Sequence, residues 1–198
     1  MPSSVNPSLI FRNAITEHLA VIQALSSQHD VLERVACEMT RAIDGGNKVL
    51  WCGNGGSAAD SQHLAAELMG RFRRERRGLP SVALTTDTSI LTAIGNDYGY
   101  EKVFQRQVEA LCVKGDVVVG ISTSGNSKNV CAALETARQA GAFTVAFTGE
   151  SGGTMAKIAD ATLHIASKDT ARIQEGHILC GHMLCDWIEL SVCERESI

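Results

Sequence analysis

Residues 48–57 read KVLWCGNGGS, a short apolar run that ends in a glycine-rich turn. The bulky, uncharged side chains that follow Lys48 predict a strand buried on both faces of a sheet. Apolar residues then recur at helical spacing through residues 57–70, which predicts a helix directly after the turn. A buried strand that runs through glycines into a helix is the building unit of parallel α/β sheets.

Four more apolar runs predict further strands of the same sheet, because they are rich in β-branched residues and alternate with helical patterns. The expected strands span residues 48–52, 81–85, 116–121, 143–147 and 161–165. The expected helices lie near residues 57–70, 88–95, 100–112, 127–140, 153–159 and 170–193. We therefore predict an α/β fold with a doubly wound, five-stranded parallel sheet flanked by helices, a flavodoxin-like three-layer sandwich.

Two helices are expected before the first strand. Apolar residues recur at helical spacing from Pro7 to Asp44, and the polar residues 28–30 interrupt the pattern. The later helices already suffice for both faces of the sheet, so the apolar stripes of these two need another partner. We expect a single domain, 1–198, in which helices at 1–45 mediate homo-oligomer contacts and residues 46–198 form the sandwich.

The composition is that of an ordinary globular protein. The chain has 198 residues, of which 44% are hydrophobic and 20% charged, so it can bury a sizeable core. A net charge of -4 argues against nucleic-acid and membrane partners, which call for an excess of basic residues. No apolar run approaches the ~20 residues of a membrane span, and the first residues do not resemble a signal peptide. We expect a cytoplasmic protein.

The cysteines are odd in number and show no CxxC spacing, and most lie in apolar helical or strand-like runs. This pattern predicts reduced, buried thiols in a reducing compartment. The seven positions are Cys37, Cys52, Cys112, Cys131, Cys180, Cys185 and Cys193.

The turn at residues 53–57, GNGGS, predicts an anion site. Glycines let the backbone approach a ligand, and the unpaired amides of the following helix point toward it. The alternative is a tight turn that binds nothing. With Ala58 the residues also fit the pattern GxGxxA, a weak indication of a nicotinamide-dependent oxidoreductase.

The third strand ends in residues 122–127, STSGNS, directly before another helix. Four hydroxyl groups, a glycine and free helix amides favour a bound phosphate. The alternative is that Ser127 simply caps the helix, but one cap needs only one hydroxyl. Ligands of doubly wound sheets bind outside the carboxyl ends of the strands, so both loops are expected to face one crevice.

Two pairs of residues predict a divalent metal site. His63 and Glu67 are four residues apart on one expected helix, and Gln174 and His182 are eight apart on the last one. Two nitrogens and two oxygens of this kind suit zinc. Spacing alone leaves alternatives open: a His–Glu pair without metal, a buried structural His182, or His177 in place of His182.

The motifs CGNGGS (52–57) and STSGNS (122–127) together resemble the sugar-isomerase (SIS) domain proteins, and specifically the phosphoheptose isomerase family. The resemblance continues through AIGNDYG (93–99), FTGESGG (147–153) and RIQEGH (172–177), and so covers nearly the whole chain. It implies that hydroxyls of the two loops hold a phosphate and that polar residues nearby contact the sugar. The implied substrate-binding residues are Asn54, Gly55, Gly56, Ser57, Asn96, Asp97, Ser122, Thr123, Ser124, Ser127 and Gln174.

The resemblance also implies an activity and a cofactor. Its members convert sedoheptulose 7-phosphate to D-glycero-D-manno-heptose 7-phosphate, the first step of ADP- or GDP-heptose biosynthesis for lipopolysaccharide or capsule, and they form homotetramers. The implied zinc ligands are His63, Glu67, Gln174 and His182. The family pattern therefore favours His182 over His177 as the second histidine ligand.

Moving a carbonyl between C1 and C2 needs a base for the carbon-bound proton, an acid for the oxygens and a group that steadies the enediolate. We expect Glu67 to be the base and His182 the acid, and the reverse assignment stays open.

Two features depart from the family pattern or stand outside it. Some members have an acidic residue at the position of Ala171, whereas the acid here is Asp169. The basic segment 71–77, RFRRERR, is predicted to be a solvated helix end, with substrate guidance or a subunit contact as alternatives.

The main rival is the DnaA initiator-associating protein, a non-enzymatic relative with similar loops. It lacks the acid and the histidine found here at Glu67 and His182, which favours the enzyme.

Overall fold

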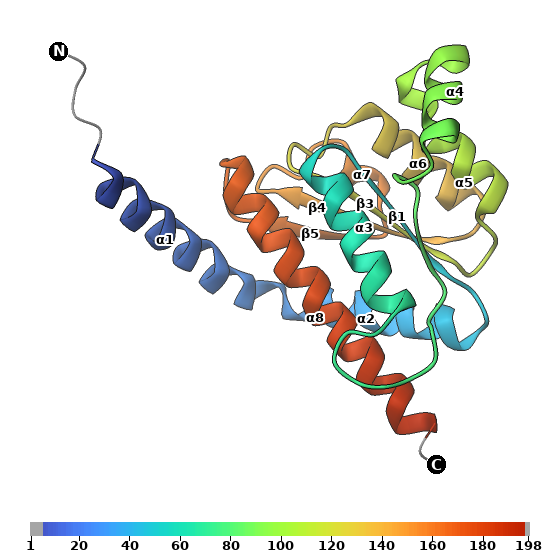
Figure 1. Ribbon diagram of the computed structural model, residues 1–198, viewed down its shortest axis with the longest axis horizontal. Coiled ribbons are helices and arrows are strands. Elements are labelled where there is room, and N and C mark those ends of the chain that lie inside the picture. Colours follow the sequence, from blue (N-terminus) through green and yellow to red (C-terminus); the bar gives the residue numbers. More distant parts are fainter. Residues whose placement is uncertain (1–5, 197–198) are drawn as a thin grey trace.

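The apolar runs form a parallel sheet in the computed structural model, which describes residues 6–196 (Figure 1). Every residue of the first and third strands is buried, as expected for strands covered on both faces. The strand predicted at residues 81–85 lies at an edge of the sheet and ends at Ala83. It is shorter than predicted because it pairs on one side only and its pairing with the first strand ends there. The strands are β1 (Val49–Gly53), β2 (Ser81–Ala83), β3 (Val117–Ser122), β4 (Phe143–Gly149) and β5 (Ala161–Ile165).

The helices follow the predicted alternation. The pattern at residues 100–112 is divided into a 3-10 turn and a short helix, and the break near residue 28 is a second 3-10 turn. The helical elements are α1 (Pro7–Ala24), η1 (Leu25–Gln28), α2 (His29–Asp44), α3 (Gly56–Met69), α4 (Thr88–Tyr98), η2 (Tyr100–Lys102), α5 (Gln105–Leu111), α6 (Lys128–Gln139), α7 (Met155–Ile158) and α8 (Thr170–Glu196).

The strand order is β2-β1-β3-β4-β5, and all neighbours are parallel. The order reverses between β1 and β3, which is the switch point where such sheets bind ligands. Gly53 at the end of β1 is in register with Ile121 of β3, so the loops that follow these strands begin side by side. The sheet topology therefore brings the two predicted anion loops together.

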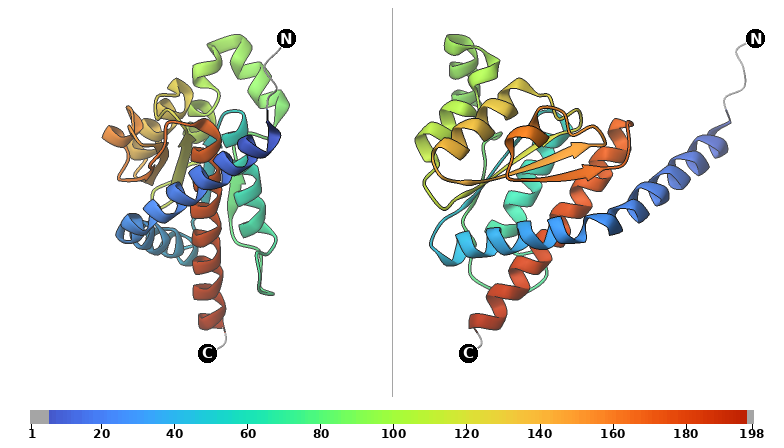
Figure 2. Two further views of the ribbon diagram at one scale, coloured as in Figure 1. Left: turned by 90° about the vertical axis from the view of Figure 1, so that its left-hand side faces the viewer. Right: turned by 180° about the vertical axis from the view of Figure 1, so that it is seen from behind.

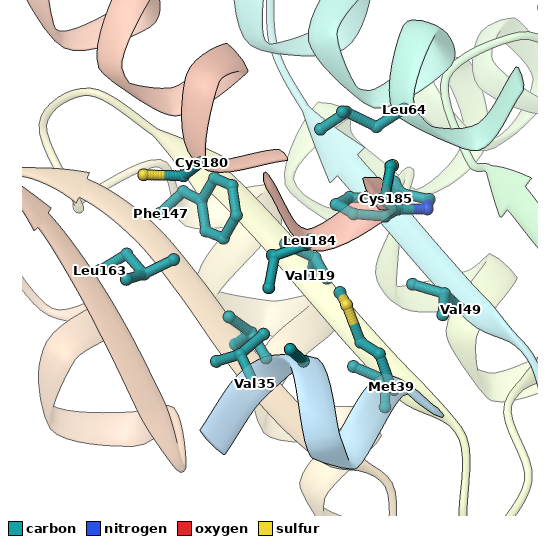
Figure 3. Close-up of a cluster of buried hydrophobic side chains, with 14 of the residues drawn as sticks. Val35, Met39, Val49, Leu64, Val119, Phe147, Leu163, Cys180, Leu184 and Cys185 are labelled. Carbon is teal, nitrogen blue, oxygen red and sulfur yellow. The ribbon is translucent and has the colours of Figure 1, made fainter. Parts of the chain in front are cut away.

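Alternate residues of each strand enter different cores, because successive side chains of a strand point to opposite faces. Val49 and Trp51 pack with α2, α3 and α8, whereas Leu50 and Cys52 pack with α5 and α6. Figure 3 shows the first core, with Met39 of α2 and Leu184 of α8 near strand residues such as Val119. The predicted three-layer α/β sandwich is confirmed.

Helix α1 extends away from the sandwich, as Figure 1 and the view from behind in Figure 2 show. It exposes large apolar side chains: 58% of Leu9 and 66% of Phe11. Its second half is held to α8, where His18 Nδ1 lies 2.7 Å from Glu175 Oε2 and Arg172 donates to the carbonyl of Ala14. Within residues 6–196 no helix is both long and apolar enough to cross a membrane.

The prediction of buried thiols is only partly right. Cys52, Cys180 and Cys185 are buried, and burial raises the pKa of each of these thiols to about 12. Cys37 is exposed on α2, because it lies on the side of that helix opposite the buried Val35 and Met39 stripe.

Candidate active site

The loop after β1 is shaped by its glycines. A side chain on Gly53 would collide with Ser57, and Gly55 has a φ of +58°, a conformation that favours glycine. Among the described side chains none caps the start of α3, where the amides of Ser57 and Ala58 donate to the carbonyls of Asn54 and Gly55. Ser57 lies in this first turn and is buried.

Asn54 of the same loop is paired with a residue that the sequence did not indicate. Its Nδ2 donates to Asn129 Oδ1, and Asn129 Nδ2 donates back to Asn54 Oδ1, both at 2.9 Å. Asn129 Oδ1 also accepts from the Val130 amide, which fixes the orientation of the Asn129 amide group. Tyr100 donates to Asn54 Oδ1 at 3.3 Å. The start of α6, through Asn129, therefore fixes the loop that follows β1.

The loop after β3 gathers its hydroxyls around Ser122. Ser122 Oγ lies 2.8 Å from Ser127 Oγ and 3.4 Å from Ser124 Oγ. Ser127 occupies the N-cap position of α6, yet its side chain makes no capping bond to any described residue. A cap alone does not explain this serine, and the hydroxyls instead form one cluster at an uncapped helix start.

The loop after β4 supports the serine loop from outside. Thr154 donates to Asn126 Oδ1 through both its amide and its hydroxyl, each at 2.9 Å. Gly149 N donates to the carbonyl of Thr123 at 3.0 Å. Gly125 has a φ of +66° and lies against the backbone of Gly152, an approach that leaves no room for a side chain. The loop after β4 thus fixes the position of the serine loop, residues 122–127, through these hydrogen bonds and this close backbone contact.

Asn96 and Asp97 lie apart from these two loops, on α4. Both are exposed, and Asn96 Nδ2 donates to Asp97 Oδ1 at 2.8 Å. Helix α4 begins at Asp87, whose carboxylate caps it by accepting from the Ile90 amide. A contact of Asn96 and Asp97 with a sugar stays a prediction.

His63, Glu67 and His182 form a cluster with the geometry of metal ligands. The Nε2 atoms of the two histidines are 3.0 Å apart, and His63 Nε2 is 3.2 Å from Glu67 Oε1. The three ligand atoms all lie within 4.8 Å of one another. Two imidazole nitrogens and a carboxylate oxygen that converge from α3 and α8 are a donor set that fits zinc.

The environment of His182 favours its neutral, ligating form. Desolvation is the largest cause that lowers its pKa, and the positive charges of His63 and Arg73 lower it further, while Glu67 acts in the opposite sense. The imidazole ring stacks on Phe72, with ring centroids 5.4 Å apart and an angle of 25° between the planes.

His177, the alternative to His182 by spacing, lies elsewhere. Its side chain is buried beside β4, where Nε2 lies 3.1 Å from the carbonyl oxygen of Thr148. Burial lowers the pKa of His177 to about 4. The structure therefore brings His182, and not His177, to the cluster on α3.

Gln174 lies at the other end of α3 from the cluster. Its carboxamide packs against Gly56, so closely that a side chain there would collide with it. His63 follows Gly56 by seven residues, or about 10 Å along a helix. Gln174 thus lines the start of α3, and its role as a zinc ligand stays a prediction.

The prediction that residues 71–77 are a solvated helix end is right about solvent and wrong about the helix: Arg71, Arg73, Glu75 and Arg77 are exposed, but the segment is not helical. Helix α3 ends at Met69, and residues 70–79, which we call the strap, form a loop along α8. The strap is held by Glu189, which accepts hydrogen bonds from three of the strap's backbone amides.

Asp169, the acidic residue nearest to Ala171, caps the start of α8, because its carboxylate accepts hydrogen bonds from the amides of Ala171 and Arg172.

Three residues of this region were missed from the sequence: Phe72, Asn129 and Glu189. Asn129 had a weak signal, since asparagine is a poor helix former and here stands near a helix start. Glu189 had a stronger one, because it shares the apolar face of α8 with Cys185 and Val192. Nothing local distinguishes Phe72.

Comparison with known proteins agrees with this geometry. The SIS domain family model matches residues 11–149. The phosphoheptose isomerase of Aquifex aeolicus (strain VF5) is 56% identical over 186 residues, which are 94% of this chain and 96% of that protein. The chain belongs to the phosphoheptose isomerase family. This family consists of aldose–ketose isomerases, so the chain is an enzyme and the oxidoreductase alternative is wrong.

Solved structures of the family have the same fold. The phosphoheptose isomerase from Neisseria gonorrhoeae superimposes with a TM-score of 0.87 at 44% identity, covering 92% of this chain and 99% of that one. The phosphoheptose isomerase from Francisella tularensis gives a TM-score of 0.85 at 37% identity, covering 93% and 100%. The family resemblance expected from the loop motifs is confirmed over nearly the whole chain.

Proposed function

We propose that the chain converts sedoheptulose 7-phosphate into D-glycero-D-manno-heptose 7-phosphate, the entry step of heptose biosynthesis. The observation that carries this proposal is the convergence of His63, Glu67 and His182 on the helix that starts at the anion loops. Ser57 and His63 are six residues apart on α3, about 9 Å along its axis. An extended seven-carbon sugar phosphate spans a comparable length, so its phosphate and its carbonyl carbons reach opposite ends of this site.

The phosphate end is held by neutral donors. Ser57, Ser122, Ser124 and Ser127 supply hydroxyls, and the first turns of α3 and α6 add the backbone amides that donate to no other described group. Two helix N-termini at one place also favour a dianion through their dipoles. Thr123, Gly55 and Gly56 complete the loops, and Asn54, Asn96, Asp97 and Gln174 serve the sugar hydroxyls in this proposal.

The other end is a zinc site. His63, Glu67 and His182 would hold the ion. Gln174, the fourth ligand that the family resemblance implies, packs at Gly56, about 10 Å along α3 from His63, and would have to reach toward them. When bound, zinc supplies Lewis acidity toward the C1 and C2 oxygens of the sugar.

Glu67 and His182 move the protons. Glu67 takes a proton from C1 of the ketose and returns it to C2, through the carboxylate oxygen that does not face His63. His182 starts neutral because its pKa is lowered, so one ring nitrogen can hold the ion while the N–H of the other, as the acid, donates its proton to O2 and then takes the O1 hydroxyl proton in return. The protons balance over the cycle, and both side chains return to their starting states.

The exchange of Glu67 for glutamine tests this mechanism. Glu67→Gln keeps the size and an oxygen ligand but removes the basic carboxylate, so kcat should fall by roughly 10²–10⁴. His182→Ala removes a ligand and the acid together, and bound zinc must therefore be measured beside activity. Glu135→Gln, an exposed change on α6, is the matched control and should keep parent activity. Parent turnover in Glu67→Gln with full zinc content would remove Glu67 from the chemistry.

The working unit in this proposal is a homotetramer in the cytoplasm. The exposed apolar side chains of α1 support assembly, and the buried free thiols Cys52, Cys180 and Cys185 suit a reducing compartment. The net charge of -4 gives no attraction to nucleic acid or membrane surfaces.

A further inference from the structure

Glu189 of α8 is a fully buried carboxylate, and within residues 6–196 its hydrogen-bond and ion-pair partners all belong to the strap, residues 70–79. Its Oε1 accepts from the Phe72 amide at 2.9 Å, and its Oε2 accepts from the amides of Arg73 and Arg74 at 2.7 and 2.8 Å. Burial raises the pKa of Glu189, but these amides and the Arg76 guanidinium outweigh that effect and lower it overall. The carboxylate is therefore charged inside the protein.

Arg76 joins this carboxylate to the end of α3. Its side chain is almost wholly buried, and its Nε lies 3.3 Å from Glu189 Oε1. Its guanidinium donates to the carbonyls of Glu67, Leu68 and Gly70, each at 2.9 Å, as well as to that of Arg77. The first three of these carbonyls belong to the last turn and the C-cap of α3, where carbonyls have no partner within the helix. Glu189 and Arg76 thus fix the turn that carries Glu67.

Phe72 connects the same carboxylate to His182. The backbone amide of Phe72 is bound by Glu189, and the Phe72 ring stacks on the imidazole of His182. His63 meets that imidazole edge-on, with centroids 5.2 Å apart and planes at 63°. The ring of His182 is therefore held between two aromatic neighbours, one of which depends on Glu189 for its place.

We propose that Glu189 is a positioning residue for the isomerisation: it holds the strap so that Phe72 keeps the His182 imidazole aimed at His63 and Glu67. This inference rests on the proposed function of His182. Stability alone does not account for a buried ion pair, because such pairs are often no more stable than apolar replacements. The strap has other anchors on α8 as well, since Arg73 and Arg74 pair with Asp186 at the surface.

Glu189→Gln tests the inference. Glutamine has the same shape, but its amide group turns a donor toward backbone amides that are also donors, so the strap should shift. The first readout is the NMR signal of the His182 ring protons in the metal-free protein, which the stacked Phe72 ring displaces. We expect these signals to move toward their positions in Phe72→Leu. Glu194→Gln, the same exchange at an exposed position of α8, is the control and should keep the parent signals.

Zinc affinity and kinetics provide two further readouts. Loss of a group that holds a metal ligand in place typically lowers metal affinity or activity by roughly 10- to 100-fold. We expect Glu189→Gln to lose about tenfold or more in zinc affinity, measured by chelator competition, and to lose kcat by a similar factor. KM should stay within about twofold, because the phosphate loops lie at the other end of α3.

The possible results separate the inference from its premises. A folded Glu189→Gln with parent NMR signals, zinc affinity and kcat would overturn the inference. If that variant does not fold, Phe72→Leu takes its place, and Phe72→Tyr, which keeps the ring, must restore the parent values. Parent values in Phe72→Leu would likewise overturn it. If the parent does not turn over the sugar at all, the proposed function fails, while the NMR and zinc measurements still decide the role of Glu189.

Discussion

Ser122 is the centre of the proposed phosphate loop, because its hydroxyl lies within hydrogen-bond distance of those of both Ser124 and Ser127. We expect Ser122→Ala combined with Ser124→Ala to weaken the binding of inorganic phosphate and of the substrate while the fold survives. Each lost donor to a buried phosphate oxygen is worth about 1–3 kcal/mol. Calorimetric titration measures the effect, with the exposed Ser26→Ala as control. Equal affinity in the double variant would take the phosphate role from this loop.

His177 makes stability depend on pH. Burial lowers its pKa in the folded state to about 4, from the ordinary value of 6.5. Above pH 6.5 the side chain is neutral in both states. Below that pH the unfolded chain takes up a proton that the folded one refuses, so the free energy of unfolding falls as the pH drops from 6.5 toward 4. The full effect is about 3 kcal/mol at 1.36 kcal/mol per pKa unit.

His177→Gln keeps a donor for Thr148 and removes the titration. Urea unfolding of parent and variant at pH 7.5 and pH 4.5 measures the difference. We expect the parent to lose roughly 2–3 kcal/mol more than the variant on acidification. Identical losses would assign the acid sensitivity to other groups.

At the scale of elements, the amide pair of Asn54 and Asn129 ties the β1 loop to the start of α6. Asn54→Ala and Asn129→Ala should therefore be coupled, with an interaction energy of about 0.5–3 kcal/mol in the free energy of unfolding. Asn129→Ala combined with Asn47→Ala, at the opposite end of β1, provides the control cycle, which should be additive within about 0.5 kcal/mol. Additivity in the first cycle as well would show that the two loops are independent.

Local pattern was enough to predict the elements around these loops, because β1 and β3 are buried on both faces and their apolar runs are uninterrupted. Local sequence pattern gave the wrong prediction at the end of α3, where the helix stops at Met69. The strap reads as a basic helix end, and what makes it a loop is Glu189, more than a hundred positions further along the chain. His177 and His182 could not be separated by spacing either, since only the approach of His63 from α3 distinguishes them. Contacts between distant elements decided both cases.

At the scale of the whole molecule, α1 extends beyond the sandwich and exposes large apolar side chains (Figure 1). We expect a mass of four 21.1 kDa chains by light scattering at micromolar concentration. Phe11→Asp with Ile15→Asp places charges on the exposed apolar side of α1 and should reduce the assembly, whereas Asn13→Asp on the same helix should not. A monomeric parent would contradict the assembly.

The most direct test of the account is to incubate the purified, zinc-loaded parent with sedoheptulose 7-phosphate and follow the sugar signals by NMR. The account predicts that D-glycero-D-manno-heptose 7-phosphate appears, that a chelator stops the reaction and added zinc restores it, and that Glu67→Gln is nearly inactive under the same conditions. A parent that binds phosphate and zinc but leaves the sugar unchanged would contradict the account and favour the initiator-binding alternative.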